Sequence, residues 1–310
     1  MQNFHNTVTE GFMDISKLAL LCDIADTNNL TTSAERMGYT QSGVSHAINK
    51  LESEMGVTIL KRTKKGMELT TDGELLMPYI RLVVSHYNRM DEIVDSILGL
   101  QRGSICIGTY CSIASQWLPH ILRTFQQMYP NIAISIREGG MREIEHWLCE
   151  GTIDFGFLSW RKEQNYKFIS LARDPLYAVV SNQLPLCSEY QENFPITAFS
   201  EYPFIASESG VDADVTAALK YSDVTPMTSF SCRDDHTIIP MVENNLGISL
   251  LPNLFLRGID ANIKKIPVTP CTIRTLGIGI LSEKTLSTAA KAFIKLSKKI
   301  VADLTLPAHE

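Results

Sequence analysis

Side chains that could read a nucleic acid gather in one short stretch, residues 41–50. An apolar stripe at Val44, Ile48, Leu51 and Met55, spaced by three and four residues, predicts a helix with one buried face. The other faces carry amide, hydroxyl, imidazole and ammonium groups, from Gln41, Ser42, Ser45, His46, Asn49 and Lys50. Such groups suit base edges and phosphates in a major groove. The stretch therefore predicts a recognition helix.

The flanking residues predict a helix-turn-helix. Thr32-Ser33-Ala34-Glu35 matches a capping box, with Thr32 as N-cap and Glu35 at the third helical position. Gly38 offers the left-handed conformation that ends such a helix. Thr40 then caps the longer helix, which we expect to close near Gly56. We expect Thr32 to lie near DNA together with the recognition helix.

A basic run, Lys61-Arg62-Thr63-Lys64-Lys65-Gly66, follows the predicted recognition helix. We interpret it as a short loop leading into the alternating strand Met67–Thr70, so that the pair forms a β-wing with Arg62, Lys64 and Lys65 on phosphates. The whole chain is acidic, with 28 Lys and Arg against 34 Asp and Glu, so a basic patch of this kind is local. The alternative interpretation is a small helical bundle with an ordinary polar surface.

The ordered pattern through this region closely resembles the winged helix-turn-helix of LysR-type transcriptional regulators. The matching residues are Leu30, Ser33-Ala34, Gln41-Ser42, Val44-Ser45, Ile48, Leu51-Glu52, Gly56, Arg62, Leu69-Thr70 and Asp72-Gly73. The resemblance implies an all-α winged DNA-binding domain over residues 13–73 that binds double-stranded DNA at a two-fold-related operator.

Residues 74–100 are predicted to form a long linker helix. Apolar residues recur at alternating spacings of four and three, which is typical of a helix paired along its length. They are Leu76, Ile80, Val83, Tyr87, Met90, Val94 and Ile97, and from Ile80 on we expect them to form a dimer seam. The alternative is a helix lying on its own domain. Pro78 is expected to kink or interrupt the first turns. In LysR-type proteins the corresponding helix pairs two subunits.

The remainder alternates strands and helices and predicts an α/β domain. Its first part, residues 104–158, has βαβαβ order, which implies a parallel sheet with right-handed crossovers. The expected strands are 104–109, 132–137, 153–158, 176–180, 204–206, 248–251 and 277–281, and the expected helices are 116–128, 141–150, 237–243 and 285–303. This part resembles the LysR-type effector domain, which has the two-lobed fold of periplasmic solute-binding proteins. The resemblance rests on Ile107-Gly108, Leu118-Pro119, Tyr129-Pro130, Gly151 and Leu246–Pro252. It implies an effector domain over 104–305, with lobe I at 104–160 and 272–305 and lobe II at 161–271.

A ligand of such a sheet binds beyond the carboxyl ends of the strands, between the lobes. The expected contacts are Ser112, Ile113, Met141, Ser159, Trp160, Ser207, Asp235 and His236. Several have a structural alternative. Ser112 could serve as a helix N-cap, Asp234 or Asp235 fits an N-cap better than a ligand contact, and Trp160 could pack the hinge.

Other classes of function lack a signal. No GxSxG, P-loop or HExxH motif occurs, so we expect no enzyme, no catalytic residues and no cofactor. The seven cysteines form no CxxC, and we expect no metal site. Neither a membrane span nor a signal peptide is evident, which favours a cytoplasmic location without a membrane partner.

The sequence thus predicts a ligand-responsive transcriptional regulator. Its expected partners are DNA, a small-molecule effector, a second copy of itself (a dimer, or a tetramer of two dimers) and RNA polymerase. The alternative is a cytoplasmic small-molecule-binding protein of solute-receptor type with a head that does not read sequence.

Overall fold

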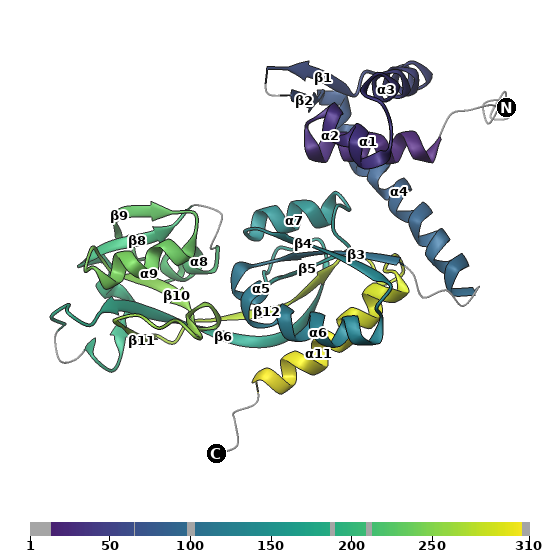
Figure 1. Cartoon of the computed structure of the whole chain (residues 1–310). Coiled ribbons are helices and arrows are strands. Elements are labelled where there is room, and N and C mark those ends of the chain that lie inside the picture. Colours follow the sequence, from purple (N-terminus) through teal and green to yellow (C-terminus); the bar gives the residue numbers. More distant parts are fainter. Residues whose placement is uncertain (1–13, 65, 98–102, 187–189, 209–212, 306–310) are drawn as a thin grey trace, which may run out of the picture. The chain divides into compact units, whose positions relative to one another are not determined.

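A computed structural model describes residues 14–64, 66–97, 103–186, 190–208 and 213–305. The chain divides near residue 100 into two compact units, and each is described by itself (Figure 1). Among the described helices, none is long and apolar enough to cross a lipid bilayer.

The N-terminal unit is built from three short helices and a two-stranded wing. The helices are α1 (Ile15–Thr27), α2 (Leu30–Met37) and α3 (Gln41–Met55). Their apolar faces meet in one core, in which Leu21, Ile24, Val44 and Leu51 are fully buried. Burial of such side chains is the main driving force that holds short helices together, because each alone is marginal in water.

The turn residues act as the sequence predicts, except at the start of α2. Asn29, not Thr32, is its N-cap, and the Asn29 side-chain oxygen accepts the backbone N–H groups of Thr31 (2.9 Å) and Thr32 (3.3 Å). The predicted capping box is therefore wrong, because an earlier capping side chain starts the helix at Leu30 and leaves Thr32 inside its first turn. The left-handed Gly38 and Gly56 end α2 and α3 as predicted, at φ +72° and +69°.

The wing consists of β1 (Leu60–Thr63) and β2 (Gly66–Leu69), which pair antiparallel. Lys61 and Arg62 lie on β1 rather than in the predicted loop, because the chain reverses only after Thr63. Glu52 fixes the start of the wing to α3: its Oε1 accepts the backbone N–H groups of Ile59 (2.6 Å) and Leu60 (2.8 Å).

The long helix α4 (Thr71–Ile97) begins three residues before the predicted start at 74 and continues through Pro78 without a break. A proline removes one N–H donor, and the packing of this end of the helix outweighs that loss. Ile80, expected on the dimer seam, is buried in the core of the N-terminal unit. The neighbouring Arg81 guanidinium forms an ion pair with Asp26 of α1 at 2.7 Å. The first turns of α4 therefore belong to the N-terminal unit.

The C-terminal unit has two lobes that share one continuous sheet. In lobe I, β3 (Gly103–Thr109) lies between β4 (Ile132–Glu138) and β5 (Phe155–Ser159) and is parallel to both. The parallel order predicted for residues 104–158 is confirmed, and β12 (Ile273–Ile280) joins this sheet antiparallel to β5. The reason is topological, because the chain enters β12 from lobe II at the opposite end of the sheet.

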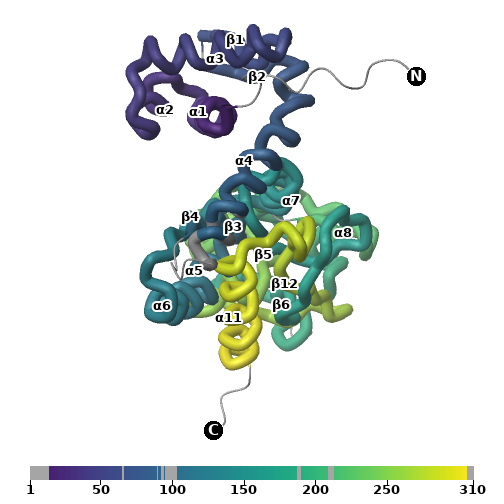
Figure 2. Tube along the Cα trace, turned by 90° about the vertical axis from the view of Figure 1, so that its right-hand side faces the viewer, coloured from purple at the N-terminus to yellow at the C-terminus, as the bar shows by residue number. Residues whose placement is uncertain are grey.

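Helices cover both faces of the lobe I sheet. α7 (Met141–Cys149) lies on one face, and α6 (Leu118–Met128) and α11 (Thr288–Thr305) lie on the other (Figure 1). Figure 2 shows α6 and α11 side by side. The helix predicted over 116–128 corresponds to α6, which begins at Leu118. A separate short helix that the sequence did not predict, α5 (Cys111–Gln116), precedes it with Trp117 between them.

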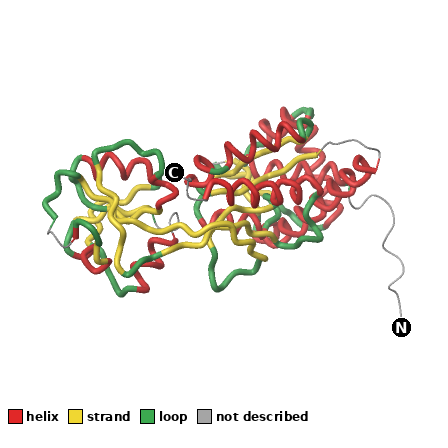
Figure 3. Tube along the Cα trace, turned by 90° about the horizontal axis from the view of Figure 1, so that it is seen from below, coloured by secondary structure: helices red, strands yellow, loops and turns green. Residues whose placement is uncertain are grey.

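The strand β6 (Lys167–Ser181) joins the lobes. Its first part pairs with β12 in lobe I, and its second part pairs with β10 (Ser249–Pro252) and β11 (Ile263–Thr269) in lobe II. Figure 3 shows the strands passing from one lobe into the other. Phe168 and Leu171 pack on the lobe I core, so the predicted lobe boundary at 161 is wrong. Residues up to about Pro175 belong to lobe I because they complete its sheet.

Lobe II contains several elements that the sequence did not predict. Its described elements are β7 (Phe194–Pro195), the 3₁₀ helix η2 (Ile196–Ser200), β8 (Pro203–Ser207), α8 (Ala213–Tyr221), β9 (Met227–Cys232), α9 (Asp235–Glu243) and α10 (Asn253–Leu256), together with β10, β11 and the end of β6. β8 and β9 are parallel, and α8 connects them. This βαβ unit places the start of α9 at the edge of lobe II that faces α5 of lobe I, as the contact between Cys111 and His236 shows.

Candidate functional site

The outer face of α3 carries the polar residues that the sequence predicts for a recognition helix. Val44, Ile48 and Leu51 are buried, whereas Gln41, Ser42, His46, Asn49 and Lys50 are exposed and Ser45 is half-buried. Thr40 caps the helix, since its Oγ1 accepts the backbone N–H of Gly43 at 3.1 Å. The helix therefore offers its N-terminal end and one polar face to a partner, which is how recognition helices meet a major groove.

Two of the predicted contacts are engaged within the protein. The ammonium of Lys50 lies 3.9 Å from Glu54, which also pairs with Lys17 at 3.3 Å. Ser42 lies 3.2 Å from the capping oxygen of Thr40. Thr32 is exposed in the first turn of α2. Exposed ion pairs are weak, so Lys50 can exchange Glu54 for a phosphate at small cost.

The wing carries cations on both of its faces. On β1, Lys61 stands opposite Glu68 and Arg62 stands opposite Met67, so that the two cations point to alternate sides of the strand pair. Lys64, at the tip, is exposed like both of them. Lys65, also expected on phosphates, lies outside the described residues. Cations on an exposed hairpin can bind phosphates without reading sequence.

Beyond the N-terminal core, α4 exposes a row of apolar side chains. Val83, Tyr87, Met90 and Val94 are 39–53 % exposed and recur at the predicted spacings of four and three. The side chain of Ile97 lies outside the described residues. Exposed apolar residues in a regular row mark a surface that another helix can cover.

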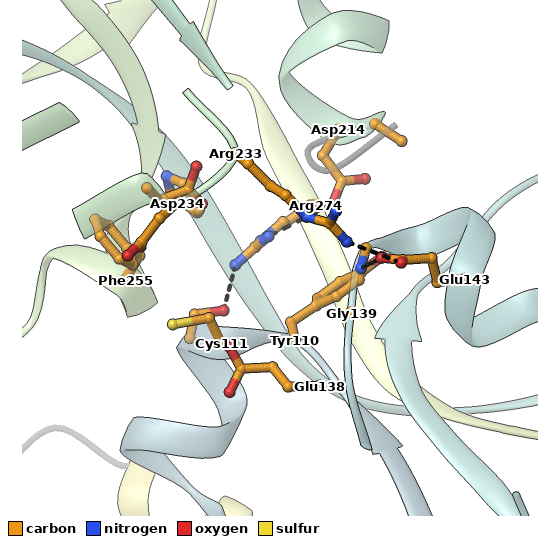
Figure 4. A pocket seen from close by; sticks show the side chains of 15 residues that line it. Tyr110, Cys111, Glu138, Gly139, Glu143, Asp214, Arg233, Asp234, Phe255 and Arg274 are labelled. Carbon is orange, nitrogen blue, oxygen red and sulfur yellow. Dashed lines mark hydrogen bonds and ion pairs between the residues drawn. The ribbon is translucent and has the colours of Figure 1, made fainter. Parts of the chain in front are cut away.

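A cavity of about 320 Å³ lies between the lobes of the C-terminal unit (Figure 4). Lobe I contributes Tyr110 and residues of α5, the end of β4, the β4–α7 turn, α7 and β12. Lobe II contributes residues of α8, the start of α9, β10 and α10. The described lining residues are Tyr110, Cys111, Ser112, Glu138, Gly139, Gly140, Glu143, Ala213, Asp214, Arg233, Asp234, Asp235, Pro252, Phe255 and Arg274. The cavity thus lies where the sequence predicts the ligand, between the two lobes.

Arg274 of β12 is the central charged group of this cavity, and the sequence analysis missed it. Its side chain is only 6 % exposed and lies 2.9 Å from Asp174 and 3.6 Å from Asp214. It also donates a hydrogen bond to the Ser112 hydroxyl at 3.2 Å. Ser112 therefore lines the cavity as predicted. It does not cap α5, whose N-cap residue Tyr110 makes no side-chain capping bond.

Three of the predicted contacts are buried and lie outside the described cavity lining. The Tyr110 hydroxyl lies 3.1 Å from the Ser159 hydroxyl and donates to the sulfur of Met141 at 2.8 Å, and both partners are fully buried. Ser159 also donates to Asp214 at 2.6 Å. Ile113 is fully buried in the lobe I core. Ile113, Met141 and Ser159 are not among the described lining residues, to which Tyr110 and Asp214 contribute, so their role as effector contacts stays a prediction.

Trp160 is also outside the cavity lining and is 53 % exposed, with its backbone N–H bonded to Thr275. Trp160 follows the last residue of β5, so the alternation of a strand turns it away from the position of Ser159.

Of the contacts predicted in lobe II, one lines the cavity and the others pack against or hydrogen-bond to lining residues. Asp235 lines the cavity and accepts a hydrogen bond from the Ser207 hydroxyl at 2.5 Å, so Ser207 holds Asp235 rather than facing the cavity. Burial raises the pKa of Asp235 above its ordinary value. Asp234 is the N-cap of α9, as the structural alternative held. His236 packs its ring against Phe255 and lies 3.6 Å from the Cys111 sulfur, outside the lining.

Acidic groups outnumber basic ones around the cavity. The described lining holds the carboxylates of Glu138, Glu143, Asp214, Asp234 and Asp235 and the guanidinium groups of Arg233 and Arg274. Arg233 pairs with Glu143 across the lobes at 3.1 Å, as Figure 4 shows. Burial and these neighbouring carboxylates raise the pKa of the Cys111 thiol to about 11, so it is protonated at neutral pH.

No grouping of His, Cys, Asp and Glu among the described residues has the arrangement of a metal site. The carboxylates of the cavity are held by Ser207, by the α9 N-terminus and by arginines rather than facing one centre. The arrangement suits an organic ligand, because a cavity of about 320 Å³ combines aromatic side chains with hydrogen-bonding and charged groups.

Comparison with known proteins agrees with this geometry. The model of the bacterial regulatory helix-turn-helix protein, lysR family, matches residues 15–74, and the LysR substrate binding domain matches residues 98–301. The chain is 26 % identical over 291 residues to YvbU of Bacillus subtilis, an uncharacterized HTH-type transcriptional regulator, covering 93 % of this chain and 99 % of YvbU.

Solved structures share the fold at low identity. Full-length OxyR from Pseudomonas aeruginosa superposes with a TM-score of 0.71 at 19 % identity, covering 94 % of this chain and 95 % of OxyR. CbnR in complex with its target DNA superposes with a TM-score of 0.63 at 18 % identity, covering 93 % of this chain and 99 % of CbnR. With a helix-turn-helix and wing in one unit and a two-lobed ligand-binding domain in the other, this chain belongs to the LysR family of DNA-binding transcriptional regulators.

Proposed function

We propose that this regulator reads a two-fold-related DNA site with α3 and changes its action when a small molecule occupies the cavity between its lobes. The observation that carries the proposal is the exposed polar face of α3, which begins at the Thr40 cap and is flanked by the cationic wing. Gln41, Ser42, Ser45 and His46 meet base edges, while Asn49, Lys50 and Thr32 lie at the margins of the groove. CbnR, which has the same fold, has been seen with its target DNA.

The wing supplies affinity rather than specificity. Arg62, Lys64 and Lys65 bind phosphates, and each contact releases a counterion, so binding weakens as salt rises. The chain as a whole has a formal net charge of −6, so DNA repels most of its surface. The local basic patch of the wing therefore decides which surface faces the DNA.

A second copy of the chain covers the exposed seam of α4. Val83, Tyr87, Met90 and Val94 pack against the same residues of the partner, which removes their apolar surface from water. Ile80 is left out of this seam because it is already buried in its own core. Pairing in this way presents two recognition helices to one operator, and two such dimers can form a tetramer.

The cavity binds the effector and couples it to DNA. The contacts that bridge the lobes beside the cavity include Ser159 to Asp214 at 2.6 Å and Arg233 to Glu143 at 3.1 Å. A ligand touching Asp214 or Glu143 competes with these contacts and so favours one lobe orientation over another. Different affinity for two orientations is the thermodynamic requirement for a response at the DNA. The regulator acts in the cytoplasm, where DNA is, and adjusts the access or activity of RNA polymerase.

The test is selection of genomic DNA fragments by the purified full-length protein, followed by footprinting. Recovery of a shared, two-fold-related motif supports the proposal, and the genes beside it indicate candidate effectors. Equal binding to all fragments, or binding to none, would contradict it and would favour a small-molecule receptor with a head that does not read sequence. A variant with Lys64→Ala should recover the same motif with lower yield, because a phosphate contact carries no sequence information.

A further inference from the structure

We infer that the ligand of the inter-lobe cavity carries a positively charged nitrogen, an ammonium or guanidinium group, and is not a simple carboxylate. The inference rests on the proposed effector role of this cavity and concerns the chemical class of that effector. It follows from the balance of charges around the cavity, from its walls and from its volume.

The two arginines of the lining are already balanced by protein carboxylates. The Arg274 guanidinium lies 2.9 Å from Asp174 and 3.6 Å from Asp214, and it donates a hydrogen bond to the Ser112 hydroxyl. Arg233 pairs with Glu143 at 3.1 Å. At the buried Arg274, an incoming anion would have to displace a carboxylate that the fold holds in place, so this guanidinium is not arranged to receive a carboxylate ligand without a rearrangement. The Arg233–Glu143 pair is exposed and weaker, but it also leaves no net positive charge at this edge of the cavity.

Three further carboxylates of the lining have no such counterion. Glu138, Asp234 and Asp235 form no ion pair within 4.0 Å among the residues that the structure describes. Glu138 comes from the end of β4 in lobe I, and the two aspartates come from the start of α9 in lobe II. They approach the cavity from both lobes, so a cation between the lobes is attracted to each.

The same three carboxylates act together at one point of the lining. Cys111 lies there, and burial together with Glu138, Asp235 and Asp234 raises the pKa of its thiol. Groups that oppose a negative charge on this sulfur would oppose a carboxylate ligand at the same place and would favour a cation there.

The walls and the volume restrict the ligand further. Tyr110 and Phe255 contribute aromatic surface, and the face of an aromatic ring attracts a cation electrostatically. The volume of about 320 Å³ is at the lower end of the range for small-molecule sites. A compact amine therefore fits better than a large aromatic compound. A hydroxyl or a second polar group on it can still hydrogen-bond to Ser112.

Isothermal titration calorimetry with the full-length protein tests the charge class. The probes are linear five-carbon compounds that differ only at their ends: 1,5-diaminopentane, 1,5-pentanediol and glutarate. We expect the diamine to bind and the diol and the diacid to bind at least about tenfold more weakly, since a charge-assisted hydrogen bond is roughly twice as strong as a neutral one. Tighter binding of glutarate than of the diamine, or binding of none of the three, would overturn the inference.

Two variants locate the binding. Glu138→Gln and Asp235→Asn keep the size of each side chain and remove its charge, and each should weaken diamine binding by about tenfold. Asp260→Asn, which removes an exposed carboxylate outside the cavity lining, is the matched control and should leave binding unchanged. Equal diamine affinity in all of these proteins would place the diamine elsewhere and refute the assignment.

Operator binding by the same preparations separates this inference from the proposed function. If glutarate binds more tightly and the protein still selects a two-fold-related DNA motif, the charge class is wrong while the regulatory function stands. If the diamine binds through Glu138 and Asp235 but no DNA motif is selected, the ligand site stands and the proposed function fails.

Discussion

Replacement of Arg274 by methionine should destabilise the C-terminal unit strongly, because it leaves a buried carboxylate without its counterion. Asp174 is 4 % exposed and accepts hydrogen bonds from the Arg274 guanidinium at 2.9 Å and from the Leu254 backbone N–H at 2.8 Å. In Arg274→Met only the second of these bonds remains. Removal of one partner of a buried ion pair typically costs about 3–5 kcal/mol. For a unit of this size, that corresponds to a fall in Tm of about 6–20 °C.

The loss should depend on pH with a defined sign. Burial raises the pKa of Asp174 above its ordinary value even with Arg274 present, and the variant lacks the guanidinium that opposes this rise. A carboxyl group whose pKa is raised by folding favours the folded state below that pKa and disfavours it as the pH rises through it. The deficit of Arg274→Met should therefore be largest near pH 8 and should shrink toward pH 5, as Asp174 becomes protonated.

Calorimetric unfolding of the full chain at pH 5, 6, 7 and 8 measures the effect. Two further variants serve as controls. Adding Asp174→Asn to Arg274→Met removes the buried charge and should recover much of the loss. Lys167→Met breaks the exposed 2.6 Å pair with Glu283 and should leave the Tm nearly unchanged, because exposed pairs contribute little. Equal small losses in Arg274→Met and Lys167→Met, or a deficit that does not vary with pH, would refute the reasoning.

Three other features lead to expected outcomes. Gln41→Ala should weaken operator binding by about ten- to a hundredfold and leave binding to random DNA nearly unchanged. Lys64→Ala should weaken binding to both DNAs and reduce the slope of log affinity against log salt concentration by about one. DNA-binding titrations at several salt concentrations measure both effects, and identical behaviour of the two variants would contradict these roles. Met90→Glu, on the exposed row of α4, should shift the protein toward monomer in analytical ultracentrifugation, while the control Asn88→Glu should not. An unchanged dimer in both variants would refute the proposed dimer seam. The Cys111 thiol, with its pKa raised to about 11, should be alkylated slowly at pH 7.5 and faster with each unit of pH up to about 11. Mass spectrometry measures the alkylation rate at each pH, and a rate that levels off near pH 8 would contradict this prediction.

The N-terminal unit could be predicted in most of its parts because its signals are local. The caps at Gly38, Thr40 and Gly56 and the apolar stripe of α3 depend on residues within a few positions of each other, and the structure confirms them. The one wrong cap, at the start of α2, had a competing capping residue three positions earlier. The predicted interruption at Pro78 failed because propensity is a weak influence where tertiary packing holds a helix.

The position of the cavity could be predicted from the sequence, but most of its lining residues could not. Ser112 and Asp235 were found because they follow a strand and begin a helix, positions that reach the carboxyl end of a parallel sheet. Ile113, Met141 and Ser159 were assigned to the cavity by the same rule, yet they are buried and are not among the described lining residues. Proximity along the chain to a strand end does not specify which side chain points inward.

The sequence by itself determined the family, the helix-turn-helix with its basic wing, and the apolar row of α4, since each is a pattern of neighbouring residues. Only the tertiary structure decided which groups meet at the cavity. Arg274 is separated from Asp174 by 100 residues and from Ser112 by 162, and no periodicity links them. A lone arginine in the apolar strand β12 was the one available signal, because a buried cation requires a partner. Its partners, and the acidic surplus around them, exist only once β6, α5 and α8 have been brought together by the fold.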